Sequence, residues 1–189
     1  PVLIDIPKDL VDPNNPASQF EDYDPTGHNL PGYNPITEPD PLKIQEAVEL
    51  ILRSERPVIY SGGGILKARA ATQLRELAEL LDVHVVTTLM NRGGFPDNHP
   101  LALGMPGMHG NYTAVTVLQE ADLLITLGAR FDDRVTGRLD GFAPDAKIIH
   151  ADIDPAEFNK VRFADVSIQG DVGKTITEMI SALNQLQQT

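Results

Sequence analysis

Short apolar runs alternate with amphipathic segments from residue 41 onward, and this alternation restricts the possible folds more than any other feature of the chain. The runs are mostly apolar, as in Asp122–Leu127, and do not alternate apolar with polar residues. Strands of this kind occur in parallel sheets covered by helices on both sides. We therefore predict an α/β fold, a doubly wound, mostly parallel sheet of about five or six strands with helices on both faces. The expected strands are Pro57–Tyr60, Val83–Thr87, Asp122–Leu127, Lys147–Ala151 and Val166–Gln169.

The segments between these strands carry helix signals. Asp40 followed by Pro41 is typical of a helix start, because the Asp side chain caps the helix and Pro suits the first turn. Apolar residues then recur every three or four positions, which indicates one buried helix face. Two stretches, 88–110 and 129–145, are expected to be irregular loops. Further helices are expected near 70–81, at Asn111–Glu120 and at Val172–Leu186, with a helical turn at Pro155–Asn159.

The first 40 residues differ from the rest in composition. Nine of the 15 prolines lie within the first 41 positions, and Pro this dense prevents helices and inner strands. Residues 10–40 are therefore expected to form an acidic, Pro-rich linker. Val2–Ile6 is typical of a strand, either an edge strand of the same domain or, as we prefer, the last strand of a preceding domain. The domain itself then covers residues 41–189, and the missing initial Met fits a piece of a longer protein or a processed one.

Composition excludes several classes of function. The net charge of −12 and the pI near 4.7 argue against nucleic acid or an anionic membrane as a partner, because both need a basic surface. The chain has no Cys, which excludes disulfides, zinc-thiolate sites and a Cys nucleophile. No apolar run approaches the roughly 18 residues of a membrane span, and the first residues do not resemble a signal peptide. We therefore expect a protein that is not secreted, cytoplasmic in a bacterium or organellar in a eukaryote.

In an open parallel sheet, ligands bind outside the carboxyl ends of the strands, so the residues after each strand are the candidates. Gly62–Gly64 follows the first expected strand, and a glycine turn lets a backbone approach a phosphate closely. The usual dinucleotide fingerprint needs a third glycine where this chain has Lys67, so an ordinary NAD site is disfavoured. A tight turn without a ligand stays an equal alternative at this point.

Other loops carry charged or polar candidates. Arg130–Arg134 holds two Arg and two Asp, which could bind phosphate or form a solvated ion-pair network. Asp152 and Asp171 follow later strands and could accept hydrogen bonds from a ribose or cap the next helix. His109 could contact a ligand or form a local hydrogen bond. No nucleophile–base pair and no metal-ligand spacing stands out, so we expect a nucleotide-binding domain with no catalytic or metal-binding residue of its own.

Six motifs occur in an order that matches a known family. They are Pro57–Gly64, Thr88–Met90, Phe95–Pro100, Leu103–Gly110, Gly128–Gly137 and His150–Pro155. Over essentially its whole length the chain resembles the central domain of the large catalytic subunit of acetolactate synthase (acetohydroxyacid synthase), a family of thiamine-diphosphate enzymes. The resemblance implies a Rossmann-like central domain. It also implies that residues 1–9 are the last strand of a truncated amino-terminal, pyrimidine-binding domain.

In that family the central domain binds FAD, which takes no net redox part in the reaction. The resemblance implies that the glycine turn (Gly62–Gly64) and the loop Gly128–Gly137, called the arginine loop below, lie along the diphosphate and ribityl chain. It also implies that residues after the last two strands frame the adenosine. Met108, Asp133 and Arg134 would also border the substrate channel, where herbicidal inhibitors bind. The implied FAD-binding residues are Gly62, Gly63, Gly64, Thr88, Leu89, Met90, Gly107, Met108, His109, Gly128, Ala129, Arg130, Asp132, Arg134, Val135, Asp152, Ile153, Gly170, Asp171 and Val172.

The resemblance implies that the parent enzyme condenses two pyruvates, or pyruvate and 2-oxobutyrate, in branched-chain amino-acid biosynthesis. Its catalytic glutamate, and the Mg²⁺ motif that anchors thiamine diphosphate, would lie in flanking domains, so we expect this fragment to be inactive alone. Expected partners are those missing domains, a homo-oligomer of catalytic subunits and a regulatory small subunit. Asn91–Gly94 is more glycine-rich than is usual in the family.

Two other functions stay open. The isolated domain could be an assembly scaffold that binds no ligand, because other domains and a partner subunit would supply much of the flavin surface. It could instead be the central domain of another thiamine-diphosphate decarboxylase, related to those acting on oxalyl-CoA or benzoylformate, which takes ADP or nothing. The Arg130–Arg134 loop argues against this last alternative.

Overall fold

The computed structural model describes residues 3, 5, 6, 12, 14 and 35–187. The chain falls into two units, Pro1–Asn34 and Pro35–Thr189, and each is described by itself. In the first unit, the backbone N–H and the side-chain amide of Asn14 donate to Oδ1 of Asp12, at 2.8 and 3.0 Å. The strand expected at Val2–Ile6 and the linker expected over residues 10–40 lie largely outside the described residues.

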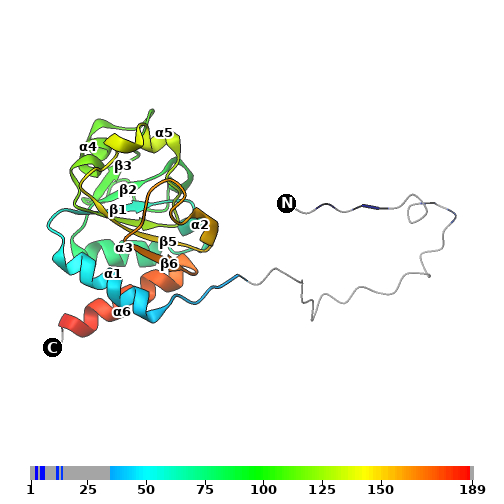
Figure 1. Ribbon diagram of the computed structural model, residues 1–189, viewed down its shortest axis with the longest axis horizontal. Coiled ribbons are helices and arrows are strands. Elements are labelled where there is room, and N and C mark those ends of the chain that lie inside the picture. Colours follow the sequence, from blue (N-terminus) through cyan, green and yellow to red (C-terminus); the bar gives the residue numbers. More distant parts are fainter. Residues whose placement is uncertain (1–2, 4, 7–11, 13, 15–34, 188–189) are drawn as a thin grey trace. The chain divides into compact units, whose positions relative to one another are not determined.

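Six strands of the second unit form one sheet in the order β3-β2-β1-β4-β5-β6 (Figure 1). Every neighbouring pair is parallel, so each connection crosses over the sheet. The prediction of a doubly wound, parallel α/β fold is confirmed. The strands are β1 (Pro57–Ser61), β2 (Val85–Thr87), β3 (Ala102–Gly104), β4 (Leu123–Leu127), β5 (Lys147–Asp152) and β6 (Val166–Gln169).

Helices cover both faces of the sheet. Ile59 faces a core formed with α1, α3 and α6, whereas Tyr60 faces a second core that includes residues of α4. Successive strand residues point to opposite faces, so both faces of the central strands are buried, which explains why their runs are mostly apolar. In Figure 1, α1, α3 and α6 gather on one side of the sheet. The helices are α1 (Pro41–Arg53), α2 (Gly64–Lys67), α3 (Ala71–Leu81), α4 (Tyr112–Glu120), α5 (Asp133–Thr136) and α6 (Val172–Gln187).

Two helix starts follow the expected capping pattern. The Asp40 side chain accepts a hydrogen bond from the Leu42 N–H at 2.9 Å, with Pro41 in the first turn of α1. The Asn111 side chain accepts from the Ala114 N–H at 2.8 Å at the start of α4. These bonds satisfy N–H groups that have no partner within the helix. The helices expected after Asp40 and Asn111 are therefore confirmed.

Both expected loops contain short regular elements that the sequence pattern did not indicate. β3 lies within 88–110, and α5 lies within 129–145. Each is three or four residues long, which is too short for apolar periodicity to show. β3 is defined by its pairing with Val85 and Val86 at the sheet edge, so it depends on a tertiary contact.

Candidate functional site

The strand order reverses at β1, with β2 and β3 on one side and β4, β5 and β6 on the other (Figure 1). In doubly wound sheets the crevice at this reversal, outside the carboxyl ends of the strands, is the usual ligand site. Gly62–Gly64 follows β1, and Gly128–Arg130 follows β4. The fold therefore brings two of the predicted cofactor-binding segments to the two flanks of the reversal.

The two turns pack backbone to backbone. The Gly62 N–H donates to Leu127 O at 2.9 Å, and the Gly64 N–H donates to Gly128 O at 3.0 Å. A Cβ atom on Gly62 would lie 2.3 Å from Gly128 O, and Gly128 itself has a φ of +56°. Glycine is the residue that tolerates both the close approach and the positive φ. The contact between the turns is thus sufficient reason for these glycines, with or without a ligand.

Thr88–Met90 lies beside the glycine turn on its other side. The Thr88 N–H donates to Ser61 O at 2.9 Å, and a Cβ atom on Gly63 would lie 3.1 Å from Met90 Cβ. Leu89 and Met90 leave 69% and 73% of their surface exposed. The two neighbouring side chains together expose apolar surface beside the glycine turn.

The glycine-rich segment Asn91–Gly94 has a packing reason. The Asn91 side chain is buried, and its Nδ2 donates to Ser61 Oγ at 2.9 Å. A Cβ atom on Gly94 would lie 2.0 Å from Asn91 Oδ1. Gly94 therefore makes room for a buried amide that joins this segment to the end of β1.

The loop that carries Gly107, Met108 and His109 contacts the arginine loop. The Met108 N–H donates to Arg134 O at 3.1 Å. Gly107, at φ +97°, faces the same carbonyl, because an added Cβ there would lie 2.5 Å from Arg134 O and 3.3 Å from Val135 Cα. The Met108 and His109 side chains are exposed. The fold therefore joins 107–109 to 134–135, two segments that the sequence places in separate loops.

Arg130 and Arg134 extend from the loop after β4 with 65% and 75% of their side chains exposed. Their ion pairs with Asp132 and Asp133 are long, at 3.8 and 3.9 Å. Asp132 caps α5, where its Oδ1 accepts from the Arg134 N–H at 3.0 Å. This hydrogen bond, with the nearby Arg charges, lowers the pKa of Asp132 below its usual value. Because the guanidinium groups are only weakly engaged by carboxylates, they are available to an anion.

The turns after β5 and β6 lie at the far end of the sheet edge that the carboxyl ends of the strands form. The Gly170 N–H donates to Asp152 O at 3.1 Å, so the two turns are adjacent. With strands about 4.8 Å apart, the turn after β6 lies about 14 Å from the turn after β1, a distance that an extended dinucleotide can span. Ile153 is exposed, whereas the Val172 side chain is buried in the core. The last predicted cofactor-binding segment, Gly170–Val172, therefore lies at the edge of the sheet but away from the reversal of strand order at β1.

Asp171 is engaged at the start of α6, where its Oδ1 accepts from the Lys174 N–H at 3.1 Å. We expect Asp171→Ala to lower the free energy of unfolding by about 0.5–2 kcal/mol, and Asp171→Asn to lower it far less, because Asn caps helices as well as Asp does. Urea unfolding of both variants measures this difference, and equal losses would contradict the capping role. Asp171→Asn is thus the variant that separates ligand binding from stability.

Three buried polar side chains lie in one row across the sheet, and sequence reasoning did not select them as site residues. Tyr60 of β1 pairs with Thr126 of β4, which pairs with His150 of β5. The Tyr60 hydroxyl donates to Arg130 O at 3.2 Å, and His150 Nε2 lies 2.9 Å from Ala129 O. Thr126 and His150 each interrupt an apolar run near the end of a strand, and that interruption is the signal that could have found them; Tyr60 ends its apolar run and gives no such signal.

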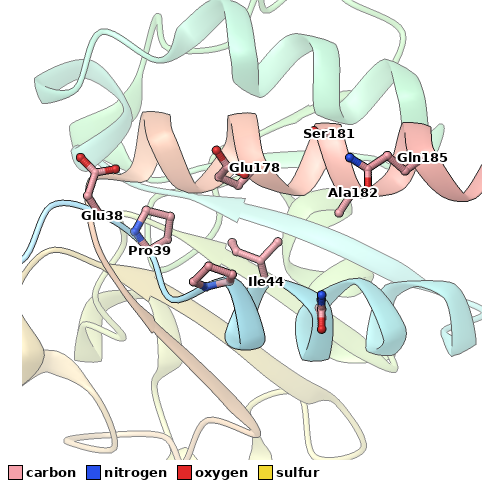
Figure 2. A pocket seen from close by; sticks show the side chains of 9 residues that line it. Glu38, Pro39, Ile44, Glu178, Ser181, Ala182 and Gln185 are labelled. Atoms are coloured by element: carbon pink, nitrogen blue, oxygen red, sulfur yellow. The ribbon is translucent and has the colours of Figure 1, made fainter.

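Two grooves are found in the second unit. One, of 460 Å³, runs between α1 and α6, and Figure 2 shows Ile44 projecting from α1 toward α6. The other, of 320 Å³, lies beside β6 and the start of α1. Neither of these two grooves is lined by a predicted cofactor-binding residue.

Among the residues that the structure describes, no group of three or more His, Cys, Asp or Glu side chains is placed to hold a metal ion. The described helices include none whose length and apolar character would let it cross a membrane.

Comparison with known proteins identifies the family. Residues 44–179 match the central domain of thiamine pyrophosphate enzymes. The chain belongs to the thiamine pyrophosphate enzyme family. Within that family it is similar to the acetolactate synthase of Mycobacterium bovis (57% identical over 182 residues), the acetolactate synthase large subunit of Corynebacterium glutamicum (50% over 180 residues) and the probable acetolactate synthase large subunit of Methanocaldococcus jannaschii (48% over 187 residues).

These matches cover 96%, 95% and 99% of this chain but 29%, 28% and 31% of the relatives. The chain thus spans about three tenths of the length of the curated relatives that it matches. The family resemblance drawn from the six sequence motifs is confirmed, as is the assignment to the central domain. Membership of the thiamine pyrophosphate enzyme family implies thiamine diphosphate as the cofactor of the parent enzyme.

Proposed function

We propose that this chain is the FAD-binding central domain of an acetolactate synthase large subunit, with the flavin nucleotide along the carboxyl edge of the sheet. The observation that carries the proposal is the meeting of four predicted segments around the reversal of strand order: the glycine turn, Thr88–Met90, the loop at 107–109 and the arginine loop. Identity of 57% to the acetolactate synthase of M. bovis, over nearly the whole chain, supports the choice of parent enzyme.

The side chains at this edge fit FAD in three respects. Arg130 and Arg134 offer exposed guanidinium groups to a diphosphate, which such groups bind in two-pronged fashion. Met90 and Met108 offer exposed, polarisable thioethers to a flat aromatic ring. Asp152 offers a carboxylate at the end of β5, where a ribose hydroxyl can donate to it. In this proposal bound FAD supplies no net redox chemistry.

The parent protein would condense two pyruvates, or pyruvate and 2-oxobutyrate, to a 2-acetohydroxy acid. Thiamine diphosphate, its Mg²⁺ and the catalytic glutamate would be held outside this chain, in flanking domains. Residues 1–9 would end the preceding domain, residues 10–40 would form a linker, and residues 41–189 would form the central domain. Other catalytic subunits and a regulatory small subunit would complete the assembly. The coverage of 29% of the M. bovis relative supports a larger parent.

Calorimetric titration of the 189-residue chain with FAD, and with ADP for comparison, tests this function. We expect a dissociation constant for FAD of about 1 μM, equivalent to about −8 kcal/mol. Arg130→Ala is expected to weaken FAD binding about tenfold or more, because a hydrogen bond to a charged group contributes about 1.5–3 kcal/mol. Arg138→Ala is the matched control, since Arg138 is 87% exposed and pairs with Asp140. We expect the control to change the affinity by less than about twofold.

Each contrary result has a defined meaning. Equal FAD affinities of Arg130→Ala and the parent chain would contradict the assigned site. Binding of ADP with no preference for FAD would favour an ADP-binding central domain of another thiamine-diphosphate decarboxylase. Undetectable binding of both nucleotides by a folded chain would favour the scaffold, with the flavin surface completed by other domains.

A further inference from the structure

The backbone of the arginine loop is held from within the protein by two buried side chains. His150 Nε2 lies 2.9 Å from Ala129 O, and the Tyr60 hydroxyl donates to Arg130 O at 3.2 Å. Both side chains have no exposed surface, and they come from β5 and β1, the two neighbours of β4. Two consecutive carbonyl groups of the loop therefore point into the protein.

This orientation also decides where the adjoining N–H groups point. The described chain has no cis peptide bond, and in a trans peptide the N–H points opposite to the C=O. The N–H groups of Arg130 and Phe131 share peptide units with the carbonyls of Ala129 and Arg130, so they point away from the interior. Within residues 35–187, neither N–H donates a hydrogen bond to a protein acceptor.

His150 is present in the form that donates. A carbonyl oxygen only accepts, so Nε2 carries the proton, and Nδ1 has no partner among the described residues. Burial lowers the pKa of His150 although the charges of Asp152 and Glu157 oppose it, so the ring is neutral near pH 7. The edge of the ring meets Phe131 and Phe158, with centroids 5.4 and 5.2 Å away.

An apolar side chain would fill this place without leaving a buried nitrogen unpaired, and an unpaired buried polar atom costs free energy. The core alone therefore gives no reason for an imidazole at position 150. The donor at Nε2 supplies that reason, because it holds the Ala129 carbonyl.

We propose that His150 and Tyr60 are positioning residues that direct the Arg130 and Phe131 N–H groups outward as hydrogen-bond donors to a diphosphate. This inference rests on the proposed function, because the diphosphate is taken to be that of FAD. Successive outward N–H groups beside a guanidinium form a favourable anion-binding surface. Neither positioning residue touches the ligand; each acts through the carbonyl that it holds.

Inorganic pyrophosphate is the probe for this inference, with the amide NMR signals of the full chain as the readout. In the parent chain we expect pyrophosphate to shift the Arg130 and Phe131 amide signals. His150→Phe keeps an aromatic ring but removes the donor, and we expect about tenfold weaker pyrophosphate binding. His150→Gln places an amide N–H near the position of Nε2 and should restore the affinity to within about threefold of the parent. Tyr60→Phe removes only the hydroxyl and should weaken binding about threefold.

A purely structural role predicts another pattern. Both His150 variants would then melt at lower temperature and bind pyrophosphate as tightly as the parent chain. The affinities of the His150→Phe and His150→Gln variants would not differ. That result would overturn the inference, as would the absence of pyrophosphate shifts at Arg130 and Phe131 in the parent chain. If His150→Phe does not fold, Tyr60→Phe decides the question, because it deletes a single oxygen.

The outcomes also separate this inference from the proposed function. Pyrophosphate binding at the two amides without FAD binding would reject the FAD proposal and leave the positioning roles supported. FAD binding that all three variants leave unchanged would reject the positioning roles and leave the proposed function supported.

Discussion

Gly62→Ala is expected to destabilise the domain by about 3 kcal/mol or more, beyond the usual cost of overpacking by one methyl group. The added Cβ would lie 2.3 Å from Gly128 O and 2.4 Å from Ala129 Cα. These are backbone atoms of the neighbouring turn, so no flexible side chain can move aside. Separating the turns would break the hydrogen bond from the Gly62 N–H to Leu127 O. We expect the thermal midpoint to fall by about 6–12 °C, measured by circular dichroism.

Gly141→Ala is the matched control for this prediction. A Cβ atom at Gly141 meets nothing within 4 Å, and Gly141 is not among the glycines with positive φ. We expect it to change the free energy of unfolding by less than about 0.5 kcal/mol. Equal midpoints for the Gly62→Ala and Gly141→Ala variants would show that the turns after β1 and β4 do not pack as described.

Asp122→Ala is expected to lower the free energy of unfolding by about 2–4 kcal/mol. The carboxylate accepts hydrogen bonds from Ser54 Oγ and from the N–H groups of Glu55 and Arg56, the last two at 2.7 and 2.9 Å. It thereby joins the turn before β1 to the start of β4, the two strands that flank the candidate site. Urea unfolding measures the loss. Asp145→Ala, at an exposed carboxylate, is the control and should cost less than about 0.5 kcal/mol.

The Asp122 carboxylate also makes part of the stability sensitive to acid. Partial burial acts to raise the pKa of Asp122, but the hydrogen bonds from Ser54, Glu55 and Arg56 outweigh burial and hold that pKa below its usual value. A carboxyl group with a lowered folded-state pKa stabilises the fold above its unfolded pKa of about 3.9, and this contribution is lost as the pH falls through the folded-state pKa. The stability difference between the parent and Asp122→Asn should therefore shrink below about pH 4. A difference that grows on acidification would refute the assignment.

Sequence patterns predicted the elements whose signals are local. The caps at Asp40 and Asn111 and the apolar run of β4 each lie within a few neighbouring residues, and all three are present. β3 could not be predicted in this way, because three half-buried residues carry no periodic signal and form a strand only against β2. The same limit applies to the candidate site, whose segments were identified one by one but whose contacts were not.

The glycine turn illustrates the difference. Its sequence left a phosphate-binding turn and an empty tight turn as equal alternatives. The structure adds that Gly62 and Gly64 are needed for contact with the turn after β4, which the spacing of glycines along the chain cannot show. These contacts account for the glycines without a ligand, so in the proposed function the binding of phosphate depends on neighbouring groups, above all the arginine loop.

Local signals in the sequence were enough to predict the parallel α/β class, the capped helix starts and the polar turns that end the strands, because each depends on residues close together in the chain. Which turns meet depends on how the strands pair in space. The strand order sets Gly62 against Gly128 and aligns Tyr60, Thr126 and His150 in one row beneath the arginine loop. Those residues are far apart in the chain, and their register follows from how the whole sheet pairs and packs, which no local pattern encodes.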